Sequence, residues 1–96
     1  MSRVIRTSPA LQDVLSIVTY IGERNVSAAD HWLSQLDRIL ELLAKNPELG
    51  ERIDALGHNV RRQVLGSFLV FYRPSIDGIE LLRVLHGSRR IEDLFD

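Results

Sequence analysis

The spacing of apolar residues changes once along this chain, near residue 59, and this change constrains the fold more than any other feature. Before it, apolar residues recur every three or four positions in two stretches, as on helices that lie against a core. After it, three short β-rich runs alternate with turn-forming residues. The first helical stretch has Leu11, Val14, Leu15, Val18 and Ile21, and the second has Ala29, Trp32, Leu33, Leu36, Ile39, Leu40 and Leu43; the β-rich runs cover residues 60–65, 68–73 and 79–86.

A short β-branched segment at residues 3–7 precedes the first helical stretch, so the expected order is β-α-α-β-β-β. Gly66-Ser67 and residues 74–78 separate the later runs and are typical of tight turns, which predicts a three-stranded antiparallel meander. Two helices with a tight connection pair as a hairpin, and a sheet face can cover both of their apolar stripes. The sequence therefore predicts an α+β fold, with an antiparallel sheet and the helical hairpin packed on one face.

Helix boundaries can also be located from capping residues. Ser8 followed by Pro9 predicts an N-cap at Ser8, and Ser27 is the expected cap of the second helix. Asn46-Pro47 ends that helix, because the residue before proline is disfavoured in helical geometry. Residues 47–59 are expected to form a loop with at most one helical turn, and residues 90–95 could add a short final helix.

The chain has 96 residues and no cysteine. A chain of this length supports one core, so we expect residues 1–96 to form a single domain. The absence of cysteine excludes a disulfide framework and a thiolate zinc site. No apolar run reaches the roughly 18 residues that span a bilayer, and the first residues lack the apolar core of a signal peptide. We therefore expect a cytoplasmic protein without membrane contact.

The formal net charge of −1 hides an asymmetry. Residues 23–58 carry seven acidic side chains, whereas residues 59–91 carry six arginines against only Asp77 and Glu80. Pairing the apolar sets of the strands inward places Arg61 and Arg83 on or near the uncovered sheet face, with Arg73 as a weaker third candidate. Such a surface would attract an anionic partner. The alternative is a solvated face whose arginines pair with Glu80 and Asp77, each pair contributing about 0–1 kcal/mol.

His86 is the histidine that could act as a general acid or base, because it ends the last strand close to Arg89. A histidine at a strand end is more often structural, so both readings stay open. His31 and His58 carry no motif, and no combination of residues has metal-ligand spacing. We expect no cofactor and no metal.

Several short segments together resemble the RelE/ParE superfamily of toxins from type II toxin–antitoxin modules. They are SPALQDVLSIVTYI in the first helix, the alanine-rich start of the second helix, NPELG at its end, and RRQVLGSFLVFYRPSIDGIELLRVLHGSR at residues 61–89. Each is weak alone, but their order and spacing cover nearly the whole chain. The resemblance implies a helical hairpin on an antiparallel sheet.

The superfamily has two branches, which implies two alternative activities. RelE-like members cleave mRNA on the ribosome with lysines or a Glu/His set, together with arginines and a tyrosine near the C-terminus. Here the single lysine, Lys45, lies at the end of the second helix, and the chain ends without a tyrosine. Arg61 and Arg83 match cationic positions of the family, and His86 would be the catalytic residue of a nuclease, but the set is incomplete. The ParE-like branch, which poisons DNA gyrase, is therefore preferred.

The resemblance also implies partners. The expected partners are DNA gyrase, held in its DNA-cleaved state, and a cognate antitoxin that covers the toxin surface in a hetero-oligomeric complex. The expected target-binding residues are Arg61, Arg83, His86, Arg89 and Arg90. Two alternatives remain: a ribosome-dependent mRNA endonuclease, and an inactive relative that serves only in the regulatory toxin–antitoxin complex.

Overall fold

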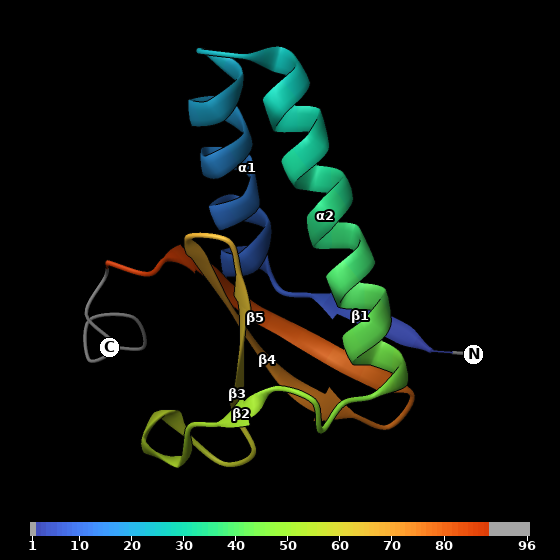
Figure 1. Ribbon diagram of the computed structural model, residues 1–96. Helices are drawn as coiled ribbons and strands as arrows, with labels where there is room; N and C mark the ends of the chain where they lie inside the picture. Colours follow the sequence, from blue (N-terminus) through green and yellow to red (C-terminus); the bar gives the residue numbers. More distant parts are fainter. Residues whose placement is uncertain (1, 89–96) are drawn as a thin grey trace.

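The computed structural model describes residues 2–88 and consists of a helical hairpin on one face of a five-stranded sheet (Figure 1). Two helices follow the first strand, and the remaining strands come after them. The elements are β1 (Arg3–Arg6), α1 (Ser8–Gly22), α2 (Val26–Lys45), β2 (Glu51–Arg52), the 3-10 turn η1 (Asp54–Leu56), β3 (Arg61–Leu65), β4 (Phe68–Ser75) and β5 (Gly78–His86). The expected α+β fold is confirmed.

The strand order across the sheet is β1-β5-β4-β3-β2. The meander of β3, β4 and β5 is antiparallel, as expected. The sheet as a whole is mixed, because β1 pairs in parallel with β5, with Arg3 opposite Gly78 and Arg6 opposite Leu81. A parallel partner needs a long crossover, and the two helices between β1 and the meander supply it. The two-residue strand β2 was not expected; it pairs with Arg61 and Arg62 of β3.

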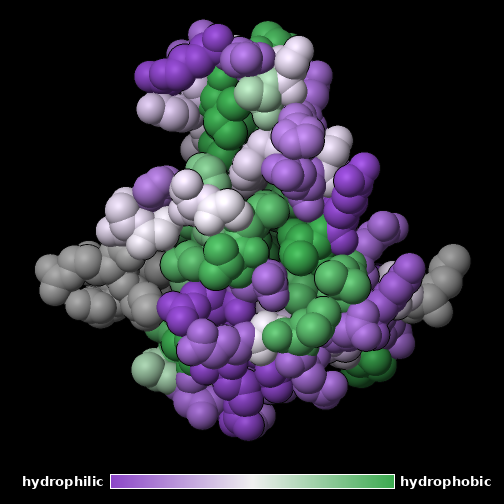
Figure 2. Space-filling view, viewed as in Figure 1, coloured by the Kyte–Doolittle hydropathy of each residue, from purple (hydrophilic) through white to green (hydrophobic). Residues whose placement is uncertain are grey.

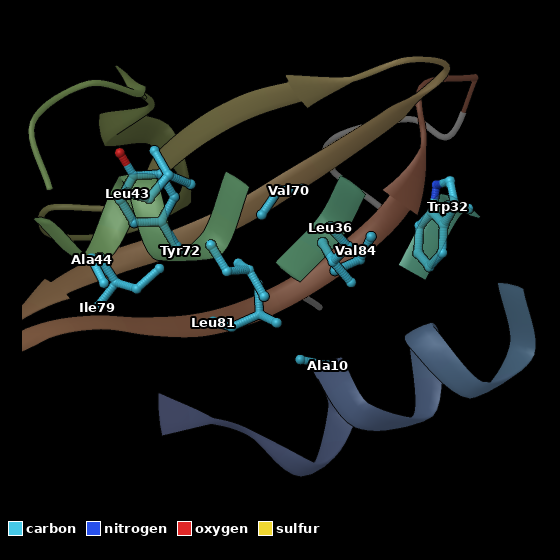
Figure 3. Packing of buried hydrophobic residues seen from close by; sticks show 11 residues of the cluster. Ala10, Trp32, Leu36, Leu43, Ala44, Val70, Tyr72, Ile79, Leu81 and Val84 are labelled. Carbon is cyan, nitrogen blue, oxygen red and sulfur yellow. The ribbon is translucent and has the colours of Figure 1, made fainter. Parts of the chain in front are cut away.

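The main core lies between the helical hairpin and the sheet. Figure 3 shows side chains from both helices and from β4 and β5 pointing toward one another in this layer. The apolar stripe of α2 is confirmed as the helix side of the core. The buried members are Ala10, Trp32, Leu36, Leu40, Leu43, Ala44, Val70, Tyr72, Ile79, Leu81 and Val84.

Both predicted N-caps are one or two residues out of place. Thr7, not Ser8, caps α1: its Oγ1 accepts a hydrogen bond from the Ala10 N–H at 3.3 Å. Thr7 Oγ1 also lies 2.9 Å from the Leu81 carbonyl oxygen, to which it donates, so the same side chain ties the start of α1 to β5. Asn25, not Ser27, caps α2 and accepts from the Ala28 N–H at 3.0 Å. Helix α2 ends at Lys45, directly before Asn46-Pro47 as expected, and α1 ends at Gly22.

A β-bulge interrupts β5 and changes which residues face the helices. Phe71 is opposite Arg83, but the next residue, Tyr72, is opposite Leu81. One extra residue in β5 shifts the alternation, so Leu81 and Val84 both lie in the helix-side core. The bulge therefore puts Leu81 and Val84, three positions apart, on the same face of β5. In β4 the residues alternate regularly, with Val70 and Tyr72 toward the helices and Phe71 on the other face.

The other face of the sheet carries a second, smaller apolar cluster. Phe71 and Leu85 are buried there. The partly buried Leu56, Leu69 and Leu82 pack against them, and Leu56 belongs to η1. The segment between α2 and β3 therefore contributes to both the edge and this face of the sheet. The final helix considered for residues 90–95 lies outside the described residues.

Candidate partner-binding surface

Arg83 does not project from an open sheet face. Its Nε and Nη2 donate to the two carboxylate oxygens of Asp13 in α1, at 2.7 and 3.0 Å. The hydrogen bond to Asp13 raises the pKa of the Arg83 guanidinium. The same carboxylate accepts from the backbone N–H of Val84 at 3.0 Å. Asp13 thus binds both a side chain and the backbone of β5, which fixes α1 against this strand.

Arg61 lies on the helix side of the sheet, beside Tyr72, to which it is paired across β3 and β4. Its Nη1 donates to the carbonyl oxygens of Glu48 and Gly50, at 3.1 and 2.7 Å. The expectation that Arg61 lies on the uncovered face is therefore wrong. The strand period alone cannot tell which of two faces meets the helices. Here Leu65 of β3 and Tyr72 of β4 face the helix-side core, and Arg61 lies on the same face of the sheet as these two residues.

Tyr72 and Arg61 together hold the segment that follows α2. The Tyr72 hydroxyl donates to the carbonyl of Pro47 and accepts from the N–H of Gly50, both at 2.8 Å. Burial raises the pKa of Tyr72. A Cβ on Gly50 would lie 2.5 Å from that hydroxyl oxygen, so glycine is the residue that fits here. This is a structural site, in which a buried phenol and a guanidinium form hydrogen bonds with backbone groups of one turn.

Arg62 and Arg73, the remaining arginines of the meander, are also paired with acids. Arg62 Nη2 lies 2.8 Å from the carboxylate of Glu51 in β2. Arg73 Nη1 lies 3.6 Å from the carboxylate of Glu80, which agrees with the alternative of a solvated face with ion pairs. Asp77, the other acid of that alternative, forms no ion pair with any residue in the range 2–88. The six-to-two imbalance therefore overstates the free positive charge of the described sheet, because acids outside the counted segment neutralise it.

His86 is exposed at the end of β5, and its hydrogen bonds define its tautomer. The backbone N–H of Ser88 donates to Nδ1 at 3.1 Å. A backbone N–H can only donate, so Nδ1 is the acceptor and the proton of the neutral ring is on Nε2. The ring packs edge-on against Phe68, with 5.4 Å between ring centroids. Among the described residues, none accepts a hydrogen bond from its Nε2–H.

A groove of about 350 Å³ runs beside His86. Ser16, Ile17 and Tyr20 of α1 line one side, and Phe68 and His86 line the other. Tyr20 is 60% exposed. The guanidinium of Arg24 lies 4.0 Å from the centroid of its ring, so a cation borders the mouth of the groove.

Helix α1 is unusually apolar for a helix with so much exposed surface. Ala10 is its one buried residue. Leu11 and Leu15 are 51% and 67% exposed, at positions that helical spacing places away from the His86 groove. Figure 2 shows apolar surface on the helical hairpin and across the middle of the molecule, where the hairpin meets the sheet. Apolar surface on more than one flank of a helix is typical of a binding face.

The comparisons with known proteins agree on one family. Residues 4–91 match the family model for the ParE toxin of the type II toxin–antitoxin system parDE. The chain belongs to this family. It is 35% identical over 80 residues to Toxin ParE1 of Caulobacter vibrioides, covering 82% of each chain. It is 33% identical over 96 residues to Toxin ParE1 of Mycobacterium tuberculosis strain H37Rv, covering 96% of this chain and 97% of the other.

A solved structure has the same fold as this ParE-family chain. It is described as the chromosomal ParDE TA system from P. aeruginosa, with a TM-score of 0.73 and 19% identity. The match covers 90% of this chain and 96% of that one. This likeness concerns the fold, and the match to the family model confirms that the chain belongs to the ParE family of the superfamily.

For this ParE-family toxin, sequence reasoning identified His86 as a site candidate but missed the groove beside it. The sequence signal that could have indicated this groove is the low charge of α1, whose 15 residues include a single charged side chain, that of Asp13. Of the expected target-binding residues, the structure brings Arg83 and His86 to the same end of β5, and it places Arg61 by the turn after α2. Arg89 and Arg90 lie outside the described residues. Neither described helix is long and apolar enough to cross a membrane.

Proposed function

We propose that this ParE-family toxin inhibits DNA gyrase by binding, and that a cognate antitoxin neutralises it by covering α1 and the groove beside His86. Membership of the ParE family is the observation that carries the proposal. Family membership supports a two-component system, in which the toxin binds a large enzyme and the antitoxin prevents that binding.

The target contact is assigned to His86, together with Arg89 and Arg90 that follow it. His86 offers a free Nε2–H at the rim of an apolar groove, which suits a partner carbonyl or carboxylate. Arg61 and Arg83 act through the fold, because their guanidinium groups bind backbone carbonyls and Asp13. Lys45 lies at the end of α2 and is not among the residues that line this groove, which favours target binding over the nuclease chemistry of the RelE-like branch.

The antitoxin contact is assigned to the apolar flanks of α1. Leu11 and Leu15 on one flank and Tyr20 on the other are exposed in the free chain. A segment that folds as it binds can wrap around both flanks and bury them together. Coverage of the groove in the same complex would keep gyrase away from His86.

The test compares two targets with one protein preparation. Supercoiling by purified gyrase, and the amount of cleaved DNA it holds, are measured with and without the toxin; mRNA cleavage on ribosomes is measured in parallel. We expect less supercoiling and more cleaved DNA, with intact mRNA, and rescue by the antitoxin. Unchanged gyrase activity with cleaved mRNA would favour a nuclease. No effect on either target, with normal growth after induction of the soluble chain alone, would favour an inactive relative.

His58 provides a matched control for His86. It is an exposed histidine in the loop before β3, away from the groove. His86→Ala is expected to weaken gyrase inhibition, whereas His58→Ala is expected to leave it unchanged. Equal effects of the two substitutions would remove His86 from the target contact.

A further inference from the structure

Asp13 is the one charged residue of α1, and its carboxylate faces β5 rather than solvent. The side chain is 13% exposed. Its two oxygens accept hydrogen bonds from Arg83 Nε and Nη2 at 2.7 and 3.0 Å, and from the Val84 N–H at 3.0 Å. Helix α1 buries only Ala10, whereas α2 buries six residues. The attachment of α1 to the sheet therefore depends on polar contacts more than that of α2 does.

Stability alone does not account for a largely buried ion pair at this place. Two charges lose hydration when they are buried, and apolar residues of similar volume often give equal or greater stability. A bidentate pair instead fixes position, since its two parallel hydrogen bonds form in one arrangement of the two side chains. The bond from the Val84 N–H adds the backbone of β5 to this arrangement. The contacts of Asp13 therefore suit a role in geometry.

These contacts lie where β5 no longer has a strand on its outer side. β1 pairs with β5 as far as Leu81. A bulge follows, where Thr7 Oγ1 donates to the carbonyl oxygens of Leu81 and Leu82. Beyond the bulge, Asp13 takes the place of a strand partner, two residues before His86. Bulges are frequent next to functional sites, where they change the direction of side chains. Asp13 thus holds the part of β5 that carries His86.

Asp13 also lies between the two walls of a hollow. The hollow has about 230 Å³, and its lining includes Asp13, Ser16 and Ile17 of α1 and Val84 and His86 of β5. Ser16, Ile17 and His86 also line the larger groove beside His86, so the two hollows adjoin. The separation between α1 and the end of β5 sets the width of both, and the contacts of Asp13 set that separation.

We infer that Asp13 is a positioning residue for target binding: it holds the end of β5 at one distance from α1, and so fixes the width of the His86 groove and the place of His86 at its rim. The inference rests on the proposed function in taking gyrase as the target. Binding sites need their side chains held to within about 0.5 Å, and residues behind the contact surface supply this precision. Asp13 acts through β5, because its carboxylate is occupied by Arg83 and Val84.

The first test compares two destabilised variants. Asp13→Asn keeps the size of the side chain, but its amide nitrogen is a donor and faces a donor of β5 in either orientation. Gly50→Ala is the matched control, because it strains the turn after α2, and Gly50 lines neither hollow. With both variants kept fully folded, we expect at least about tenfold weaker gyrase inhibition by Asp13→Asn, and inhibition within about twofold of wild type by Gly50→Ala. Equal losses would overturn the inference.

A second variant serves if Asp13→Asn does not fold. Asp13→Leu combined with Arg83→Met replaces the ion pair with apolar side chains of similar volume, an exchange that buried pairs often tolerate. It also removes the acceptor of the Val84 N–H. We expect a folded protein, judged by urea unfolding, whose gyrase inhibition is weakened by at least about tenfold. Full inhibition by this folded variant would contradict a positioning role.

The groove itself provides a readout that does not depend on gyrase. Nuclear Overhauser effects between the side chains of Ile17 and His86 compare the separation of the two walls in wild type and in folded Asp13→Asn. We expect a weaker signal in the variant, and an equal signal in both proteins would overturn the inference whatever the effect on gyrase. Wild-type toxin that fails to inhibit gyrase would remove the proposed function, whereas a weakened signal in Asp13→Asn would still support the positioning of His86 by Asp13.

Discussion

Arg83 and Asp13 are joined by two parallel hydrogen bonds, of 2.7 and 3.0 Å, between a strand at one end of the chain and a helix at the other. Their side chains are 25% and 13% exposed, so the pair is largely shielded from water. A bidentate contact of this kind is stronger than an exposed ion pair. The arginine expected to bind a target instead holds α1 on the sheet.

Loss of Asp13 is expected to destabilise the fold. Asp13→Ala removes the carboxylate that accepts from both the Arg83 guanidinium and the Val84 N–H, which should lower the free energy of unfolding by about 2–3 kcal/mol. The measurement is urea unfolding. Arg52→Ala is the control, because Arg52 and Asp54 form an exposed pair, and its effect should stay within about 1 kcal/mol. Equal effects of both substitutions would show that Asp13 has no special structural role.

The buried hydroxyl of Tyr72 predicts a loss of stability in alkali. Its pKa is raised in the folded chain by burial, so the phenol ionises first in the unfolded chain as pH rises above about 10. The contribution of the protonated hydroxyl to the free energy of unfolding is therefore complete below that pH. It is lost as pH rises toward the pKa of Tyr72 in the folded chain. Urea unfolding at about pH 8 and about pH 10.5 should show this decline. Tyr72→Phe should lose less stability between the two pH values than the wild type. Tyr20→Phe changes an exposed ring and should lose as much as the wild type.

Gly50 is expected to tolerate no side chain. A Cβ there would lie 2.5 Å from the Tyr72 hydroxyl oxygen and 2.7 Å from its ring, so Gly50→Ala must displace a buried aromatic ring. The expected cost is about 1–3 kcal/mol, measured by thermal or urea unfolding. Gly22→Ala is the matched control, since a Cβ at Gly22 makes ordinary contact at 3.7 Å. A larger loss for Gly22→Ala than for Gly50→Ala would show that the Tyr72 contact is not tight in solution.

The two flanks of α1 should separate antitoxin binding from gyrase inhibition. Leu15 is 67% exposed and lies away from the His86 groove, so Leu15→Glu should leave the fold intact. Because a charge would then replace buried apolar contact in the complex, we expect antitoxin binding to weaken by at least about tenfold with gyrase inhibition retained. Isothermal titration and supercoiling assays measure the two effects. Unchanged antitoxin affinity would place the antitoxin elsewhere.

The order of elements and the main core could be predicted from the sequence because both depend on periodicity, which is local. The α2 stripe around Leu36 and Leu40 is an example, since its spacing alone identifies the buried side. The first N-cap was misplaced by one residue because the choice of Thr7 depends on a distant contact, the carbonyl of Leu81. The bulge in β5 is also set by its partner strand, and no turn residue marks it.

The charge argument failed for a related reason. Counting arginines and acids within residues 59–91 treats that segment as if its side chains met only one another. In the fold, Asp13 of α1 and Glu51 of β2 reach the arginines of the sheet. Net charge by segment therefore predicts a surface only where the partners of each charge are known. The place of His86 at the end of β5 could be predicted because it does not depend on such pairing, and its role in target binding stays a prediction.

The contact between Thr7 and Leu81 joins residues 74 positions apart, and β1 has its partner in β5, the last strand of the described residues. A chain made from its N-terminus therefore carries β1 without a partner until β5 has left the ribosome. Contacts so distant in sequence also form late and slowly after release. A chain that does not yet include β5 cannot close this sheet, so β5 must be synthesised before the surface formed by the hairpin and the sheet is complete.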